Sequence, residues 1–139
     1  MVASVRRAVR IARPADDVWA LVGDFGALAE WFPGVVDAKV TTTDGVTTRA
    51  VTTASGLTIT EQIVFDDPLQ RRFQYTALLP ILHHHLATVD VFDLGDGTSL
   101  VAHATDADPD AMALIIGGAA GAGLHRLKAL LEGDGRTSR

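Results

Sequence analysis

The sequence predicts an α+β fold in which a curved, seven-stranded antiparallel sheet wraps around one long C-terminal helix. The first observation is a series of seven segments in which apolar and polar residues alternate, as they do in half-buried strands. The second is one long helical pattern that follows the last of these segments. A sheet with one apolar face needs a covering layer, and the helix is the element that can supply it.

The N-terminal part combines one strand with two short helices. Residues 4–12 alternate and predict the first strand, which ends before Pro14 because proline cannot donate to a strand ladder. Residues 14–22 predict a short helix, and residues 24–30 predict a second helical segment that leads into Trp31.

Six further strands are separated by segments rich in turn-forming residues. The Asp-Gly pair at residues 44–45 is typical of a hairpin, and such short turns join antiparallel strands. We expect these strands at residues 35–42, 46–53, 57–65, 71–77, 83–93 and 98–106.

The long helix is predicted from about residue 108 to residue 132. Asp108, Pro109 and Asp110 suit a helix N-terminus, where a capping acid, a proline and a further acid are favourable. Gly133 is the expected end of the helix. Residues 1–132 are therefore expected to form a single ligand-binding domain, and residues 133–139 a disordered polar tail.

Composition excludes several classes of function. The net charge of −5 argues against a nucleic-acid partner, since phosphates need clustered Lys and Arg. The chain has no cysteine, which excludes disulfides and a thiolate nucleophile and fits a reducing cytoplasm. Its longest uncharged stretch, residues 111–124, has 14 residues and is too short to span a bilayer. We expect a cytoplasmic protein without membrane insertion.

Three polar residues are predicted to form a row on one face of the sheet. A three-residue loop at 54–56 places Thr53 opposite Leu57, and counting back places Arg49 opposite Glu61. A five-residue turn at 66–70 then places Glu61 opposite Tyr75.

Apolar residues surround this row, because side chains alternate between the two faces along each strand. A charged pair and a phenol within an apolar face indicate either a ligand cavity or an internally satisfied polar core. The expected neighbours on this face are Val51, Ile59, Ile63, Phe73 and Ala77.

Several of these features resemble a known family. The run at residues 9–19, with Pro14 followed by an acidic helix start and the Val-Trp pair ending at Trp19, resembles the polyketide cyclase/dehydrase and lipid-transport proteins. These proteins form the small cyclase/dehydrase-type branch of the START/Bet v 1-like (SRPBCC) superfamily. The tryptophan shortly before Pro33, and the spacing of the Arg49 row, are similar too. The resemblance covers about residues 4–132 and implies the helix-grip fold, with a cavity between sheet and helix.

In this family the cavity holds sterols, lipids, polyketides or plant hormones, and only some members are enzymes. One departure concerns His103, which stands where many relatives carry a tryptophan on the last strand. The segment at residues 79–85 is the other departure. Together they predict a more polar cavity than is usual.

Each polar residue of the row has a functional and a structural interpretation. Arg49 would anchor a ligand carboxylate or enolate, with Glu61 orienting it or acting as a base, or the two would form a structural ion pair. A carboxylate tied to Arg49 is expected to have a low pKa. Tyr75 would donate to a ligand oxygen, or it would pack its ring and bond Glu61.

The histidines suggest a metal site at first sight. His83 and His85 are predicted to share one strand face, and His103 joins them if residues 95–97 form a three-residue loop. Two such side chains on one strand lie about 6–7 Å apart, which is wide for ligands of one ion, and the spacing matches no metal motif. We therefore expect no metal and no cofactor, but a solvated or cavity-mouth histidine cluster that titrates near neutral pH.

The glycine-rich stretch at residues 117–123 lies within the predicted helix, where each glycine costs about 1 kcal/mol. Close packing against the sheet is one interpretation. A helix that opens for ligand entry, or a small-residue surface for a homodimer, is the other.

The leading hypothesis is a carrier or sensor that binds a small lipophilic or amphiphilic molecule in an internal cavity. The alternatives are a polyketide cyclase, aromatase or dehydratase that uses Glu61 or a histidine for proton transfer, and a protein-interaction module. The candidate catalytic residues are Glu61, Tyr75, His85 and His103. The candidate ligand-binding residues are Trp31, Arg49, Val51, Ile59, Glu61, Ile63, Phe73, Tyr75, Ala77, His85, Val89, His103, Ile116 and Ala120.

Overall fold

Seven antiparallel strands form one sheet, as the sequence predicted, and their order is β1-β7-β6-β5-β4-β3-β2. The structure is a computed structural model, and it describes residues 1–137. The strands are β1 (Ala3–Ile11), β2 (Val35–Thr43), β3 (Val46–Thr53), β4 (Thr58–Asp67), β5 (Arg72–Leu78), β6 (His84–Asp93) and β7 (Ser99–Asp108). The helices are α1 (Ala15–Val22), the 3₁₀ helix η1 (Phe25–Glu30) and α2 (Asp110–Thr137).

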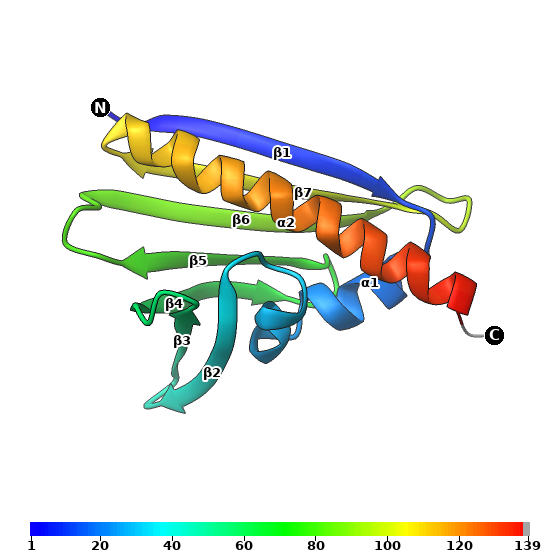
Figure 1. Cartoon of the computed structure of the whole chain (residues 1–139), viewed down its shortest axis with the longest axis horizontal. Coiled ribbons are helices and arrows are strands. Elements are labelled where there is room, and N and C mark those ends of the chain that lie inside the picture. The colour runs from blue at the N-terminus through cyan, green and yellow to red at the C-terminus, as the bar shows by residue number, and fades with distance from the viewer. Residues whose placement is uncertain (138–139) are drawn as a thin grey trace.

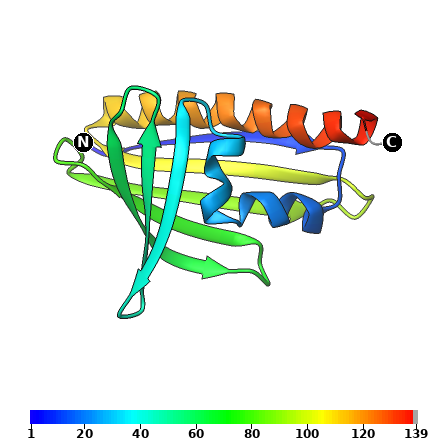
Figure 2. The same ribbon diagram turned by 60° about the horizontal axis from the view of Figure 1, so that its bottom comes forward.

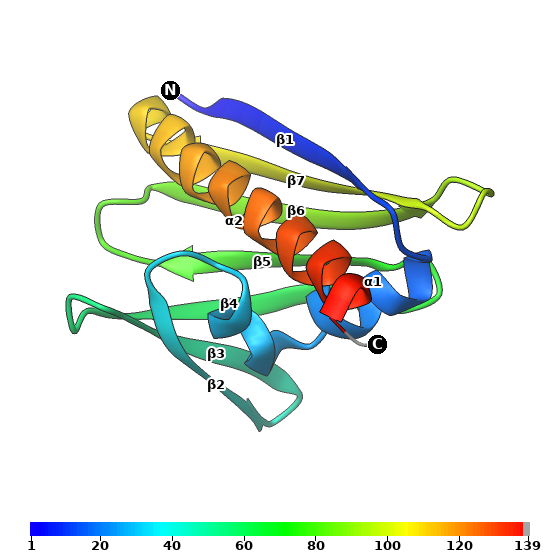
Figure 3. The same ribbon diagram turned by 45° about the vertical axis from the view of Figure 1, so that its right-hand side comes forward.

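The long helix α2 covers only part of the sheet. It lies along β1 and β7 and packs against both (Figure 1). The strands β2, β3 and β4 turn steeply away from the direction of β1 and β7, so the sheet is strongly curved (Figure 2). The short helices lie at one end, where the C-terminal part of α2 comes close to α1 (Figure 3). This is the predicted helix-grip architecture, and the curvature leaves space beside α2.

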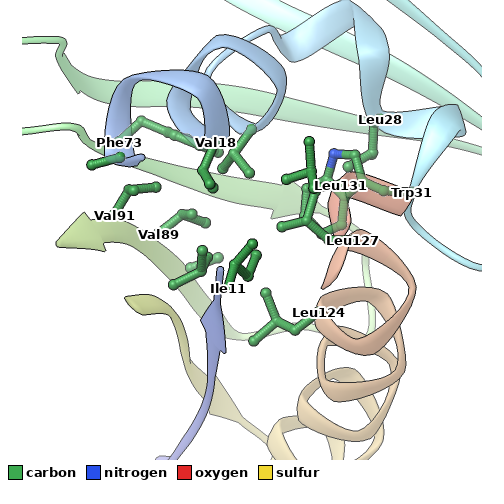
Figure 4. Packing of buried hydrophobic residues seen from close by; sticks show 14 of the residues in the cluster. Ile11, Val18, Leu28, Trp31, Phe73, Val89, Val91, Leu124, Leu127 and Leu131 are labelled. Carbon is green, nitrogen blue, oxygen red and sulfur yellow. The ribbon is translucent and has the colours of Figure 1, made fainter. Parts of the chain in front are cut away.

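The hydrophobic core occupies the C-terminal end of α2. Leu124, Leu127 and Leu131 follow one another along one face of the helix, and all three are buried. They meet Ile11 at the end of β1 and Val18 of α1, which are also buried (Figure 4). Each such side chain contributes about 1.5–3 kcal/mol relative to an exposed position, so this cluster fixes α2 on the sheet.

The helix continues beyond the end predicted at Gly133. Its C-terminal part is held to the two residues that follow β1: Arg13 Nη1 donates to the carbonyl oxygen of Leu131 at 2.8 Å, and Ala12 N donates to Glu132 Oε2 at 2.8 Å. The helix extends to Thr137, so the predicted disordered tail is wrong for residues 133–137. Residues 138–139 of that tail lie outside the described residues. The predicted domain boundary at residue 132 falls inside the helix.

By length and composition, the segment Asp110–Gly133 of α2 is able to cross a membrane, contrary to the prediction from its uncharged stretch alone. A single helix of this kind is weak support for membrane insertion. Its inner face packs on β1 and β7, which is the position of the core helix in a soluble-type fold.

The register of the sheet agrees with the prediction at the β3–β4 and β6–β7 hairpins and differs at the β4–β5 hairpin. Arg49 lies opposite Glu61, as predicted. Between β4 and β5, however, Glu61 lies opposite Ala77, and Tyr75 lies opposite Ile63. A bulge interrupts the pairing between Ile63 and Phe65, so β4 contains an extra residue.

The turn after β4 shifts the pairing by three residues from the prediction, because Asp67 pairs with Arg72, and the bulge takes one of the three back. Asp67 still belongs to the strand, and its carboxylate accepts hydrogen bonds from Leu69 N at 3.0 Å and from the Gln70 side chain at 2.7 Å. Arg71 takes a φ of 53°, which closes the turn. The register thus differs by two residues near Glu61, and an even shift keeps Glu61 and Tyr75 on the same face.

Candidate functional site

A cavity of about 250 Å³ lies between the concave face of the sheet and the N-terminal half of α2. Its walls come from β3, β4, β5, β6, α2, the η1–β2 region and the loop between β5 and β6. The lining residues are Leu28, Phe32, Pro33, Val35, Val51, Thr53, Ile59, Glu61, Tyr75, Ala77, Leu79, Leu82, His85, Met112, Ile115, Ile116 and Ala119.

Half of the predicted ligand-binding residues line this cavity, and half lie in the packed core beside it. The lining ones are Val51, Ile59, Glu61, Tyr75, Ala77, His85 and Ile116. The others do not line it: Trp31, Arg49, Ile63, Phe73, Val89, His103 and Ala120. The reason is that α1 and η1 fill the second half of the concave face, where Phe73 packs against Trp19 and Phe25.

Sequence reasoning found Ile116 but missed the other lining residues of α2 and those of the β5–β6 loop. Met112, Ile115 and Ala119 have helical spacing, so a helical stripe would have pointed to them. Leu79 and Leu82 lie in the loop between β5 and β6, for which the sequence has no periodic signal.

Arg49 lies behind Glu61 rather than in the wall. Two of its guanidinium nitrogens contact the same carboxylate oxygen, with Nε at 2.8 Å and Nη2 at 2.6 Å from Oε1. Its Nη1 donates to the carbonyl oxygen of Phe25 at 3.3 Å. The Arg49 side chain is 2% exposed and that of Glu61 is 13% exposed. The expected role of Arg49 as a direct anchor for a ligand carboxylate does not fit this geometry.

The acidity of Glu61 also differs from the expectation. Burial raises the pKa of the Glu61 carboxyl above its ordinary value, and the charge and hydrogen bonds of Arg49 oppose this effect without cancelling it. The predicted low pKa is therefore wrong, because the desolvation of this carboxylate outweighs its pairing.

Tyr75 places its ring against Arg49 and its hydroxyl against His103. The Arg49 Cζ atom lies 5.0 Å from the ring centroid, a cation–π geometry. The hydroxyl lies 3.2 Å from His103 Nε2, so Tyr75 bonds this histidine rather than Glu61. Burial, with the nearby Glu61 charge, raises the pKa of Tyr75, which keeps the phenol protonated.

His103 is a neutral partner for this phenol. Burial is the main cause that lowers its pKa to about 4, and His85 and Arg49 add to the effect. Its Nδ1 has no hydrogen-bond partner among the described residues. A neutral imidazole can donate from Nε2 or accept there, so Tyr75 can offer the cavity either a donor or an acceptor.

His85 has a structural hydrogen bond at the edge of the cavity. Its Nδ1 accepts from Ala77 N at 2.8 Å, which ties β6 to the end of β5. Burial and His84 lower the pKa of His85, while Asp106 acts in the opposite direction. The ring is thus neutral at pH 7, with its proton on Nε2.

The three adjacent histidines do not form the predicted cluster. His83 precedes β6, and both His83 and His84 are exposed, whereas His85 is buried. The loop at 95–97 does place His103 on the same inner face as His85, but the lowered pKa values of both contradict titration near neutral pH. Within residues 1–137, no group of three or more His, Cys, Asp or Glu residues is arranged to hold a metal ion.

A curved antiparallel sheet that grips one long C-terminal helix defines the helix-grip fold class. Within this class, the chain belongs to the polyketide cyclase/dehydrase and lipid transport family, whose model matches residues 2–132. The resemblance seen in the sequence is thereby confirmed.

Solved structures share this fold over nearly the whole chain. An uncharacterized protein from Bacillus thuringiensis is 26% identical, with a TM-score of 0.82 and coverage of 92% of this chain and 98% of that one. A protein from Thermobifida fusca is 29% identical, with a TM-score of 0.75 and coverage of 98% and 95%. The Zhui aromatase/cyclase from a Streptomyces species is 20% identical, with a TM-score of 0.79 and coverage of 99% and 98%. Comparison with curated proteins finds no match.

Proposed function

We propose that this protein binds a small lipophilic molecule in the cavity beside α2 and acts as its carrier or sensor. The cavity itself carries the proposal, because its walls are apolar except for Thr53, Glu61, Tyr75 and His85. An apolar cavity with few polar groups is the usual form of a small-molecule site. Membership of a family described by lipid transport supports this proposal.

A second candidate is an enzyme of the cyclase or dehydratase type. The observation in its favour is that Glu61, whose pKa is raised, lines the same cavity as the hydroxyl-bearing Tyr75. Glu61 would remove a proton next to a ketone, and Tyr75 would donate a hydrogen bond to the enolate oxygen. Such an enzyme would catalyse deuterium exchange at the α-carbon of a small β-diketone, and Glu61→Gln would abolish this exchange.

We also propose a cytoplasmic location and a ligand that arrives from solution. A chain of 139 residues without cysteine and with a soluble-type fold supports this location.

Filling the cavity tests the proposed function. A solvatochromic lipophilic probe should bind with a stoichiometry near one per chain, and Ala77→Trp should abolish binding because Ala77 lines the cavity. The matched control is Thr60→Trp, which adds the same ring at an exposed position of the neighbouring strand. Circular dichroism and thermal unfolding check that both variants fold. Unchanged probe binding by folded Ala77→Trp would place the site elsewhere.

A further inference from the structure

The charged group that faces the cavity is an acid. Among the described lining residues, Glu61 is the one acid, and its Oε1 forms an ion pair with Arg49 at 2.6 Å, whereas His85 is neutral at pH 7 and Tyr75 stays protonated. Arg49 does not line the cavity and is 2% exposed. A bound molecule would therefore meet the carboxylate before it met the guanidinium.

One oxygen of this carboxylate remains free for a ligand. Both contacts of Arg49 go to Oε1, and Oε2 has no hydrogen-bond partner among the described residues. Oε2 is not one of the fully buried polar atoms that lack a hydrogen-bond partner, so it keeps some accessible surface. Because Glu61 lines the cavity, this surface is open to a bound molecule. The cavity thus presents a strong hydrogen-bond acceptor inside an apolar wall.

We propose that the site selects an uncharged molecule that donates a hydroxyl or N–H hydrogen bond to Glu61 Oε2, and that it rejects carboxylates of the same size. This inference rests on the proposed function as a small-molecule binder. A donor to a carboxylate forms a charge-assisted hydrogen bond, which is about twice as strong as a neutral one. A ligand carboxylate would instead bring a second negative charge next to Glu61 in a desolvated site.

An ammonium ligand fits the site less well than a neutral donor. Arg49 already balances the charge of Glu61 through contacts of 2.6 and 2.8 Å. A second cation would leave one positive charge without a counterion in an apolar cavity, which is costly. A hydroxyl uses the free Oε2 without adding charge.

The size of the cavity limits the body of the ligand. A volume of about 250 Å³ lies just below the range of about 300–1,000 Å³ that is usual for sites of drug-sized ligands. The site therefore suits a single ring or a short chain that carries one hydroxyl.

Four compounds with one phenyl ring test this selectivity: 2-phenylethanol, phenylacetate, phenethylamine and propylbenzene. Each is titrated against the lipophilic probe at pH 7 with the unmodified protein. We expect 2-phenylethanol to bind most tightly and to exceed phenylacetate by about tenfold or more, since a hydrogen bond to a charged group contributes at least that factor. Phenylacetate binding as tightly as 2-phenylethanol would overturn the inference and leave the proposed function intact. Failure of all four to displace a bound probe would overturn the inference alone, whereas failure of the probe to bind would contradict the proposed function as well.

The variant Glu61→Gln assigns the selectivity to the carboxylate. It keeps the shape of the side chain and removes the charge, so the preference for 2-phenylethanol over phenylacetate should fall below about threefold. Because this change leaves Arg49 without its counterion, the double variant Arg49→Met/Glu61→Gln is measured beside it. Full discrimination in either folded variant would show that Glu61 is not its source.

Discussion

His103 is a buried histidine whose nearest charged groups give it no counterion. Its side chain lies within β7, its Nε2 contacts Tyr75, and the residue is 2% exposed. The main cause of its low pKa, about 4, is the loss of hydration that a charged imidazole would suffer there. Protonation of this one residue is therefore unfavourable in the folded state.

We predict that His103 makes the protein less stable in mild acid. The unfolded chain binds the proton below pH 6.5 and the folded chain only near pH 4, so stability falls as the pH drops between these values. The difference corresponds to about 3 kcal/mol. Glu61 acts in the opposite direction, because its raised pKa lets the folded state take up a proton first.

Urea unfolding from pH 7 to pH 4 measures this dependence, and His103→Asn should reduce the loss of stability. The exposed His125 offers the control, since His125→Asn should leave the pH dependence as it is. An equal loss in the His103→Asn variant and the unmodified protein would contradict the prediction.

At the scale of one element, the glycines of α2 serve different purposes. A Cβ atom on Gly117 would lie 2.6 Å from Val5 Cγ1, so this glycine lets the helix approach β1 closely. A Cβ atom on Gly118 would meet nothing within 4 Å. The close-packing interpretation of the glycine-rich stretch thus applies to Gly117 and not to Gly118.

We therefore predict opposite effects of alanine at these adjacent positions. Gly118→Ala should raise the free energy of unfolding by about 0.4–1 kcal/mol, because alanine restricts the unfolded chain and favours the helix. Gly117→Ala should lower it by about 1–3 kcal/mol, because Val5 and the helix backbone must move apart. Urea unfolding of the two variants measures the difference, and a gain in stability at both positions would refute it.

The register of the strands shows which features the sequence can predict. Loops of defined length and glycine content set the pairing of β3 with β4 and of β6 with β7, so Arg49 was placed correctly opposite Glu61. The pairing of β4 with β5 was not predicted, because Asp67 extends the strand and shortens the turn, and because no sequence pattern marks the bulge near Val64. Arg49, Glu61 and Tyr75 were still placed correctly on one face of the sheet, because the predicted register of β4 and β5 was wrong by two residues, an even number.

At the scale of the whole molecule, cavity and core lie one after the other along α2. Residues 112–119 of the helix include the cavity wall, and residues 124–131 carry the buried leucines. The alternation of apolar and polar residues along the strands indicated which sheet residues face the cavity. It did not indicate how far α1 and η1 fill the concave face, because that depends on how separate elements pack together.

This arrangement predicts where a ligand protects the backbone. Probe binding should slow amide exchange in residues 112–119 and in residues 77–85, which surround the cavity, and it should leave residues 124–131 unchanged. Hydrogen–deuterium exchange with mass spectrometry measures all three segments in one experiment. Protection confined to residues 124–131 would contradict the assigned site.

The placement of the cavity beside the early turns of α2 also has a consequence for evolution. Substitutions within residues 112–119 alter the wall of the cavity while the leucine cluster continues to hold the helix on the sheet. A few changes in two turns of helix can therefore reshape the cavity without releasing the helix from the sheet. Drift should be fast in these turns and slow at Leu124, Leu127 and Leu131, whose loss would release the whole helix.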